Sequence, residues 1–212
     1  YLIEPNQVLG RANKYFLNYC KKIFCYSENI ENFPDIYKNK IVVINPLVRE
    51  KIYKLNSRDK YSEKFNLLIV GGSQGANLFD KNLKNFIVNI SRKITIKVLQ
   101  QTSEKNIPFL SDLYSRNHVE NKIFSFEENF SNIIQQADLC ITRAGASTLA
   151  ELSVLNIPFI AIPLPTSKDN HQLKNAEFYK DQDCCWIIEQ HNFEEKIEEY
   201  LMRILNNKNE YL

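Results

Sequence analysis

The chain has 212 residues, of which 44% are hydrophobic, and its 27 Lys and Arg nearly balance its 25 Asp and Glu to leave a formal net charge of +2. This length holds one large domain, or one domain with part of another, around a buried core. The small net charge argues against a dedicated nucleic-acid-binding protein, and no apolar run reaches the roughly 18 residues that cross a bilayer.

Residues 1–22 are expected to form a loop-like start and one helix. Asn13 can cap a helix over residues 14–22, because a side-chain oxygen before the first turn accepts an unpaired backbone N–H. Three apolar side chains of this helix recur at helical spacing and are expected to face a core: Phe16, Leu17 and Cys20.

Two short strands are predicted next, over residues 23–27 and 41–44, and Arg49 lies just past the second. Open α/β sheets place ligand groups at this end of a strand, so Arg49 is either a ligand group or a solvated charge. Residues 55–64 are polar and show no periodicity, which is typical of a linker between two domains.

A glycine turn follows the most apolar run. Leu67–Val70 is too short for a helix and carries no charge, which predicts a strand buried on both faces. Three of the five Gly in the chain follow it, at positions 71, 72 and 75, before a helix predicted over residues 76–92. Such a turn aims unpaired N–H groups at one point, where an anion, above all a phosphate, can bind. The alternative is a tight turn that binds nothing.

Beyond the glycine turn, strands and helices alternate regularly. This pattern predicts a parallel sheet with helices on both faces, with ligands bound at the carboxyl ends of the strands. The predicted strands cover residues 94–99, 123–126, 138–142, 159–162 and 185–188, and the predicted helices cover residues 111–116, 130–137, 171–181 and 193–205.

A second glycine turn repeats the logic of the first. Gly145 follows the strand predicted over residues 138–142, and Ser147 and Thr148 stand at the start of the next helix. Two helix N-termini at one edge of a sheet can bind a diphosphate, and Ser147 or Thr148 is expected to cap the helix. Glu151 can complete a capping box with Thr148, or point into the crevice and accept hydrogen bonds from the vicinal hydroxyls of a ribose.

A proline-fixed loop over residues 163–170 delivers polar groups to a third helix start. Asp169, His171, Gln172 and Asn175 are of the right types to bind sugar hydroxyls and an amide, and each could instead cap the helix.

The Cys and His positions predict a reduced compartment and no structural zinc. The five Cys form no C-x-x-C pair and the three His form no ligand cluster. The only Met is Met202, so we expect Tyr1 not to be a natural start and an N-terminal part to be missing.

Several of these stretches resemble the MurG family, bacterial transferases that add N-acetylglucosamine to the lipid-linked muramyl-pentapeptide precursor of peptidoglycan. They are Gly71-Gly-Ser-Gln-Gly-Ala76, Arg143-Ala-Gly-Ala-Ser-Thr-Leu-Ala-Glu-Leu152 and Asp169-Asn-His-Gln-Leu-Lys-Asn-Ala176. Glu4-Pro-Asn6, Gly10 to Asn13 and Asn45-Pro46 to Arg49 look like the end of that family's first domain. The resemblance covers nearly the whole chain, in family order.

The resemblance implies a GT-B glycosyltransferase with two Rossmann-like domains around the active cleft, inverting at the sugar and using no metal or other cofactor. Residues 65–212 would be the UDP-sugar donor-binding domain and residues 1–54 the C-terminal remnant of the acceptor domain. The implied reaction transfers N-acetylglucosamine from UDP-GlcNAc to undecaprenyl-pyrophosphoryl-MurNAc-pentapeptide (lipid I), giving lipid II. The implied partners are this lipid acceptor and the cytoplasmic face of the bacterial inner membrane, bound peripherally, and no nucleic acid.

By the same resemblance, ten residues bind substrate. The general base is expected in the missing N-terminal part, so no residue here is a convincing catalytic group and the isolated chain is expected to be inactive. Family relatives often carry an apolar residue at position 127 and a Gln at position 171, so His171 receives no role. The implied contacts are Ser73, Gln74, Ser147, Thr148 and Arg49 with the diphosphate, the backbone of Phe126 and Glu127 with uracil, Glu151 with the ribose, and Gln172 and Asn175 with GlcNAc.

Other functions remain open on the residues alone. A nicotinamide-dependent oxidoreductase is disfavoured, because Val70 stands where G-x-G-x-x-G needs its first Gly and the next strand ends in Gln100 and Gln101 without a ribose-binding acid. Another UDP-sugar enzyme of the same architecture, such as a UDP-GlcNAc 2-epimerase, is a nearer rival. A third alternative is a fragment that binds a nucleotide, or nothing, without activity.

Overall fold

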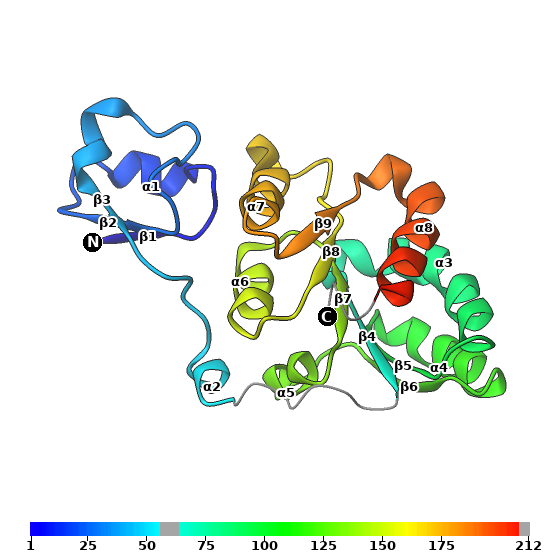
Figure 1. The fold of residues 1–212 in the computed structure, drawn as a ribbon. Coiled ribbons are helices and arrows are strands. Elements are labelled where there is room, and N and C mark those ends of the chain that lie inside the picture. The colour runs from blue at the N-terminus through cyan, green and yellow to red at the C-terminus, as the bar shows by residue number, and fades with distance from the viewer. Residues whose placement is uncertain (56–63, 208–212) are drawn as a thin grey trace.

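A computed structural model of the protein describes residues 1–55 and 64–207, apart from the side chains of residues 73–75. The described strands form two all-parallel sheets, one of three strands and one of six. The small unit, blue in Figure 1, contains β1 (Leu2–Glu4), α1 (Arg11–Phe16), β2 (Ile23–Cys25), the 3-10 helix η1 (Asp35–Lys40) and β3 (Ile41–Val43), and α2 (Glu50–Tyr53) follows it.

The large unit alternates strands and helices, as the sequence predicts. Its strands are β4 (Phe65–Val70), β5 (Ile96–Gln101), β6 (Glu120–Phe124), β7 (Leu139–Thr142), β8 (Phe159–Ala161) and β9 (Cys185–Ile187). Its helices are α3 (Gly72–Ser91), α4 (Ile107–Arg116), α5 (Phe130–Gln135), α6 (Ala146–Val154), α7 (His171–Lys180) and α8 (Phe193–Asn206), with the 3-10 turns η2 (Glu104–Asn106), η3 (Lys168–Asn170) and η4 (Gln190–Asn192).

The order of the six strands is β6-β5-β4-β7-β8-β9. The chain starts in the middle at β4, moves outward to β6, and returns to the middle at β7, which is the 3-2-1-4-5-6 order of a Rossmann sheet. β4 and β7 are direct partners, with Val70 opposite Thr142. The topological switch point therefore lies between the ends of these two strands, where such sheets bind ligands.

Helices cover both faces of the large sheet, which confirms the predicted fold class. Leu67 and Ile69 of β4 belong to the apolar cluster that contains residues of α3, α4 and α8. The alternate residues Leu68 and Val70 belong to the cluster that contains residues of α5, α6 and α7. All six residues of β4 are buried, because both faces of a parallel sheet are covered (Figure 1).

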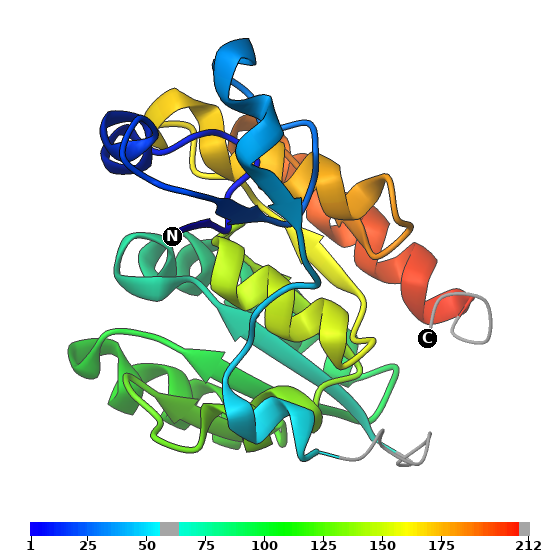
Figure 2. The ribbon, with the colours of Figure 1, turned by 90° about the vertical axis from the view of Figure 1, so that its left-hand side faces the viewer.

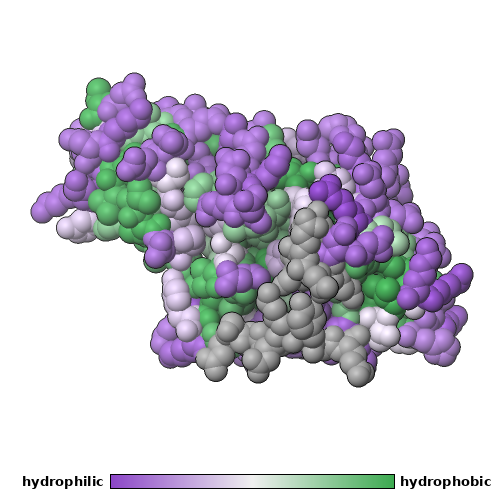
Figure 3. All heavy atoms as spheres, viewed as in Figure 1, coloured by the Kyte–Doolittle hydropathy of each residue, from purple (hydrophilic) through white to green (hydrophobic). Residues whose placement is uncertain are grey.

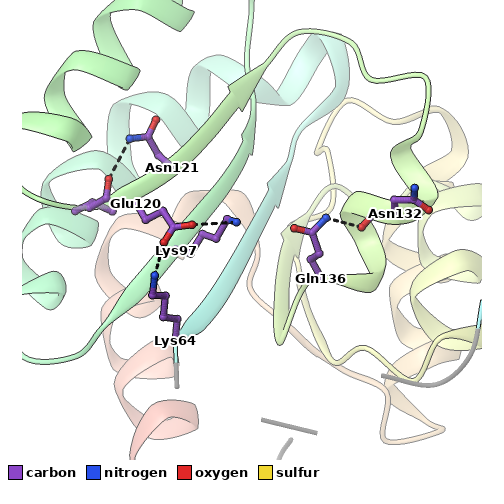
Figure 4. A network of polar contacts seen from close by, with 7 residues as sticks. Lys64, Lys97, Glu120, Asn121, Asn132 and Gln136 are labelled. Atoms are coloured by element: carbon purple, nitrogen blue, oxygen red, sulfur yellow. Dashed lines mark hydrogen bonds and ion pairs between the residues drawn. The ribbon is translucent and has the colours of Figure 1, made fainter. Parts of the chain in front are cut away.

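An ion-pair network ties three adjacent strands together near their amino ends. The Glu120 carboxylate of β6 contacts the Lys97 ammonium of β5 at 3.1 Å and the Lys64 ammonium, just before β4, at 2.7 Å (Figure 4). This network lies at the end of the sheet opposite to the glycine turns.

Edge strand β6 and helix α4 correct two predicted boundaries. β6 covers residues 120–124 rather than 123–126, because its Glu120 and Lys122 are exposed and hide the apolar signal expected of a strand. α4 begins at Ile107 rather than at residue 111, with Pro108 in its first turn, where a missing N–H costs nothing.

The first helix is shorter than predicted and begins earlier. It covers residues 11–16 instead of 14–22. Leu17 and Cys20, just after it, are buried as expected, whereas Phe16 is exposed, so its assignment to the core is wrong.

Residues 1–13 contain a strand, β1, where the sequence predicts a loop, and this strand ends in a buried carboxylate. Glu4, the last residue of β1, is buried and accepts hydrogen bonds from Gly10 N at 2.7 Å and from the side-chain amide of Asn13 at 2.9 Å. Asn13 lies inside α1, and Gly10 is the N-cap residue. The predicted capping role of Asn13 is therefore wrong, because its amide binds Glu4.

The segment after β3 runs past α6 to α2, beside α5 (Figures 1 and 2). The predicted division into residues 1–54, 55–64 and 65–212 stays a prediction, and residues 56–63 of its linker lie outside the described residues. Within the described part, no helix is both long and apolar enough to span a membrane.

Most of the large exposed apolar side chains lie in the small unit and the segment after it, and Figure 3 shows green areas over the small unit. They are Tyr1, Ile3, Tyr15, Phe16, Tyr19, Ile36, Val43, Leu47 and Tyr53.

Candidate functional site

A pocket of about 460 Å³ opens at the carboxyl ends of the central strands. This volume lies within the range of small-molecule sites in proteins. The pocket receives residues from both glycine turns, from the segment after β6 and from the segment before α2. Its lining consists of Arg49, Val70, Gly71, Gly72, Gln101, Phe124, Phe126, Glu127, Phe130, Thr142, Arg143, Gly145, Thr148, Leu164 and Gln172.

The two glycine turns lie side by side at this edge. One follows β4 and the other follows β7, and these strands pair in parallel. Gly72, the first residue of α3, has φ of +59°, a left-handed conformation that a residue with a Cβ rarely adopts. Both α3 and α6 thus begin at the pocket. The N–H groups of their first turns, apart from that of Gly72, which binds the Gln101 side chain, form a positive region suited to an anion. The predicted adjacency of two helix N-termini is confirmed.

Capping of α6 differs from the prediction. Gly145 occupies the N-cap position, and no side chain caps the helix. Ser147 and Thr148 lie inside the first turn, so their predicted capping role is wrong. Thr148 lines the pocket and Ser147 is exposed. The missing cap leaves N–H groups of the first turn without a side-chain acceptor at this helix start.

Arg49 and Glu151 form a bidentate ion pair. Arg49 Nε donates to Glu151 Oε1 at 2.6 Å, and Nη2 donates to Oε2 at 2.7 Å. The side chain of Glu151 is only 7% exposed, whereas that of Arg49 is 45% exposed. The hydrogen bond with Glu151 raises the pKa of Arg49. The predicted capping box of Glu151 with Thr148 is therefore wrong, because this carboxylate binds a cation from the segment before α2.

Phe126 and Glu127 follow β6 and line the pocket near the first glycine turn. Phe126 is 78% exposed and lies after β6, not inside the strand as predicted. The Glu127 carboxylate accepts from Lys122 Nζ at 2.6 Å, which lowers the pKa of Glu127. The Glu127 side chain is thus engaged by a lysine of β6, whereas Phe126 is exposed at the pocket.

Gln172 and Asn175 lie on α7, one turn apart. Gln172 lines the pocket, and its Oε1 accepts the Leu164 N–H at 3.0 Å. Asn175 is 1% exposed, and its Oδ1 accepts the Gln7 N–H at 2.9 Å. Its Nδ2 donates to Asn6 Oδ1 at 3.0 Å and to the Ala144 carbonyl at 3.2 Å. Asn175 thereby connects the small unit to the loop of the second glycine turn.

Arg143 lines the pocket, although no role was predicted for it from the sequence. It is 8% exposed, and Nη2 donates to Gln190 Oε1 at 2.8 Å while Nη1 donates to the Ile162 carbonyl at 3.1 Å. Its Nε is buried and has no partner among the described residues. Burial lowers the pKa of this guanidinium. Its place directly after a predicted buried strand, inside a quoted motif, was a signal that could have identified it.

Two further predicted contacts are not described. The side chains of Ser73 and Gln74 lie outside the described residues, so their roles stay predictions. In the part of the chain that the structure describes, no three His, Cys, Asp or Glu side chains gather as metal ligands.

Comparison with known proteins identifies the family to which the chain belongs. The profile described as "Glycosyltransferase family 28 C-terminal domain" matches residues 66–212. Two curated relatives are named UDP-N-acetylglucosamine--N-acetylmuramyl-(pentapeptide) pyrophosphoryl-undecaprenol N-acetylglucosamine transferase. The one from Pelagibacter ubique is 48% identical over 212 residues, and the one from Rickettsia bellii is 34% identical over 212 residues. These alignments cover 100% and 96% of this chain, and 60% of each relative.

A solved structure agrees with the sequence relatives. The crystal structure of Acinetobacter baumannii MurG aligns with 98% of this chain and 59% of its own, at 26% identity and a TM-score of 0.77. This similarity confirms the GT-B architecture predicted from the sequence, and the relatives confirm the resemblance to the MurG family. The chain spans about three fifths of the length of the relatives it matches. It therefore belongs to glycosyltransferase family 28, whose C-terminal domain corresponds to residues 66–212.

Proposed function

We propose that the whole protein transfers N-acetylglucosamine from UDP-GlcNAc to a lipid-linked muramyl-pentapeptide, undecaprenyl-pyrophosphoryl-MurNAc-pentapeptide, in peptidoglycan synthesis. The observation that carries the proposal is the pairing of β4 with β7, which brings two helix N-termini to one pocket. The identities of the donor sugar and of the acceptor are taken from the names of the relatives.

In this proposal the chain acts on the leaving group. Displacement at the anomeric carbon breaks the bond to the diphosphate, on which negative charge builds up as UDP leaves. Preorganised N–H groups of α3 and α6 would stabilise that charge without having to reorient. Arg49, Ser73, Gln74, Ser147 and Thr148 are proposed as the further diphosphate contacts. The attacking hydroxyl belongs to the acceptor, and we assign no general base within residues 1–212.

The remaining proposed contacts bind the uracil, the ribose and the GlcNAc of the nucleotide sugar. The backbone of Phe126 and Glu127 would bind the uracil edge, and Glu151 would accept hydrogen bonds from the ribose hydroxyls. Gln172 would bind GlcNAc. For Asn175 to donate a hydrogen bond to GlcNAc, it would have to exchange one of its present hydrogen bonds, because both N–H groups of its amide already donate.

We further propose that the whole protein works peripherally on the cytoplasmic face of the inner membrane. The acceptor is a lipid, and the small unit exposes aromatic residues, such as Tyr15 and Tyr19, as well as basic ones, such as Lys14. Such mixed surfaces bind anionic lipid interfaces.

Calorimetric titration of this chain with UDP and UDP-GlcNAc tests the donor part of the proposal. A few charge-assisted hydrogen bonds, each worth about 1.5–3 kcal/mol, predict micromolar binding of both once ordering costs are subtracted. No heat and no competition at millimolar UDP would overturn it. Transfer of labelled GlcNAc to the lipid acceptor by the full-length protein tests the reaction. An epimerase would act on UDP-GlcNAc without acceptor, so acceptor-independent turnover would favour that rival.

A further inference from the structure

The side chain of Gln101 bridges two parts of the pocket. Gln101 is the last residue of β5, and its Oε1 accepts the Gly72 N–H at 3.1 Å. Its Nε2 donates to the Ser125 carbonyl at 3.3 Å. Gly72 belongs to the first glycine turn, and Ser125 directly precedes Phe126. One side chain therefore connects the turn that faces the proposed diphosphate to the segment that faces the proposed base.

Only one orientation of this amide satisfies both partners. A backbone N–H needs an acceptor and a carbonyl needs a donor, and a primary amide supplies one of each. The preceding residue, Gln100, has the same side chain but points the other way, because neighbouring residues of a strand alternate faces. Gln100 is buried and binds Asp80 at 2.7 Å and Tyr114 at 2.9 Å, outside the pocket. Gln101 thus differs from Gln100 in its position at the pocket and not in its residue type.

We infer that Gln101 is a positioning residue that fixes the separation between the first glycine turn and the base-binding segment. This inference rests on the proposed function, and it assigns a role to a residue outside the ten expected contacts. A nucleoside diphosphate reaches both parts at once, through its base and through its phosphates. If the two parts are already held at the right separation, less conformational entropy is lost when the nucleotide binds.

The hydrogen bond from Gln101 to Ser125 also affects which nucleotide base the pocket binds. Uracil and cytosine differ in the donor and acceptor groups of one edge, since cytosine carries an amino donor where uracil carries a carbonyl acceptor. Backbone groups at Phe126 and Glu127 can distinguish these patterns only if the segment is held in place. Ser125, which Gln101 holds, is the residue directly before this segment. Loss of the Gln101 amide should therefore weaken UDP more than CDP.

The test compares the binding of UDP and CDP by calorimetry in four forms of the chain. Gln101→Met keeps the length of the side chain and removes both hydrogen bonds. Gln101→Glu keeps an acceptor for Gly72 and loses the donor to Ser125. Gln182→Met is the matched control, because Gln182 is exposed in the turn after α7 and its amide donates to the Phe178 carbonyl at 2.9 Å.

We expect both Gln101 variants to bind UDP about tenfold more weakly, as the loss of one to two neutral hydrogen bonds implies. We expect CDP binding to change less, so that the ratio of UDP to CDP affinity falls, while the control keeps the ratio of the unaltered chain. Equal ratios in the unaltered chain and both variants would overturn the inference, even if the variants melted at lower temperature. If the unaltered chain binds no UDP, the proposed function itself fails and the inference fails with it.

Discussion

Replacement of Arg49 or Glu151 should reveal whether their ion pair gives way to the nucleotide. The pair is bidentate, with distances of 2.6 and 2.7 Å, and the Glu151 side chain is nearly buried. Removing one partner of a fully buried pair costs about 3–5 kcal/mol, because a charge is left without compensation. Arg49 is nearly half exposed, so screening by water should reduce the cost of Arg49→Met to about 1–2 kcal/mol.

A double-mutant cycle measures this interaction directly. Urea unfolding of Arg49→Met, Glu151→Gln and the double variant should give a coupling free energy of about 1 kcal/mol without nucleotide. Saturating UDP should reduce the coupling, because the proposed ribose and diphosphate contacts engage the two side chains separately. In UDP titrations the Glu151 variant should also lose about tenfold in affinity. A coupling that UDP leaves unchanged, with normal UDP binding by both single variants, would refute this reasoning and make the pair purely structural.

Three further predictions concern stability and reactivity. Glu120 forms ion pairs with two lysines that lower its pKa, so this contribution is present above the ordinary value of 4.5 and is lost as the pH falls through the lower folded value. Glu120→Gln should therefore cost less than about 1 kcal/mol in urea unfolding at neutral pH, and this cost should shrink as the pH falls below 4.5. Gly10→Ala should destabilise the chain by about 1–2 kcal/mol in thermal unfolding, because the added Cβ would stand 3.0 Å from the buried Glu4 carboxylate; an unchanged melting temperature would contradict the tight packing there. Burial raises the pKa of Cys140, so mass spectrometry should find a thiol reagent on the partly exposed Cys184 long before it reaches Cys140.

Local patterns in the sequence were sufficient to predict the large sheet. The uncharged run of β4 and the helical spacing of Phe79, Leu83 and Ile87 depend on neighbours in the chain, so each can be recognised without the fold. Edge strand β6 was misplaced because its exposed Glu120 and Lys122 resemble a loop. The glycine turns were predictable because glycine is rare in this chain and both turns follow apolar runs.

Contacts between residues distant in sequence account for what was missed. Arg49 and Glu151 are 102 positions apart, and Gln7 and Asn175 are 168 positions apart. Their residue types suggested ligand contacts, but no local pattern indicates that each already has a protein partner. The absence of a side-chain cap on α6 has a local origin instead, because the N-cap position is occupied by Gly145, which has no side chain.

Glycine-selective NMR tests the central claim, that two helix N-termini bind a diphosphate, most directly. The chain contains only five Gly, and four of them lie in the two glycine turns, so ¹⁵N-glycine labelling gives a small set of amide signals with Gly10 as an internal control. Addition of UDP should shift the signals of both turns and leave Gly10 unchanged, and uridine should shift them much less. Binding of UDP that leaves the signals of either turn unmoved would contradict the account.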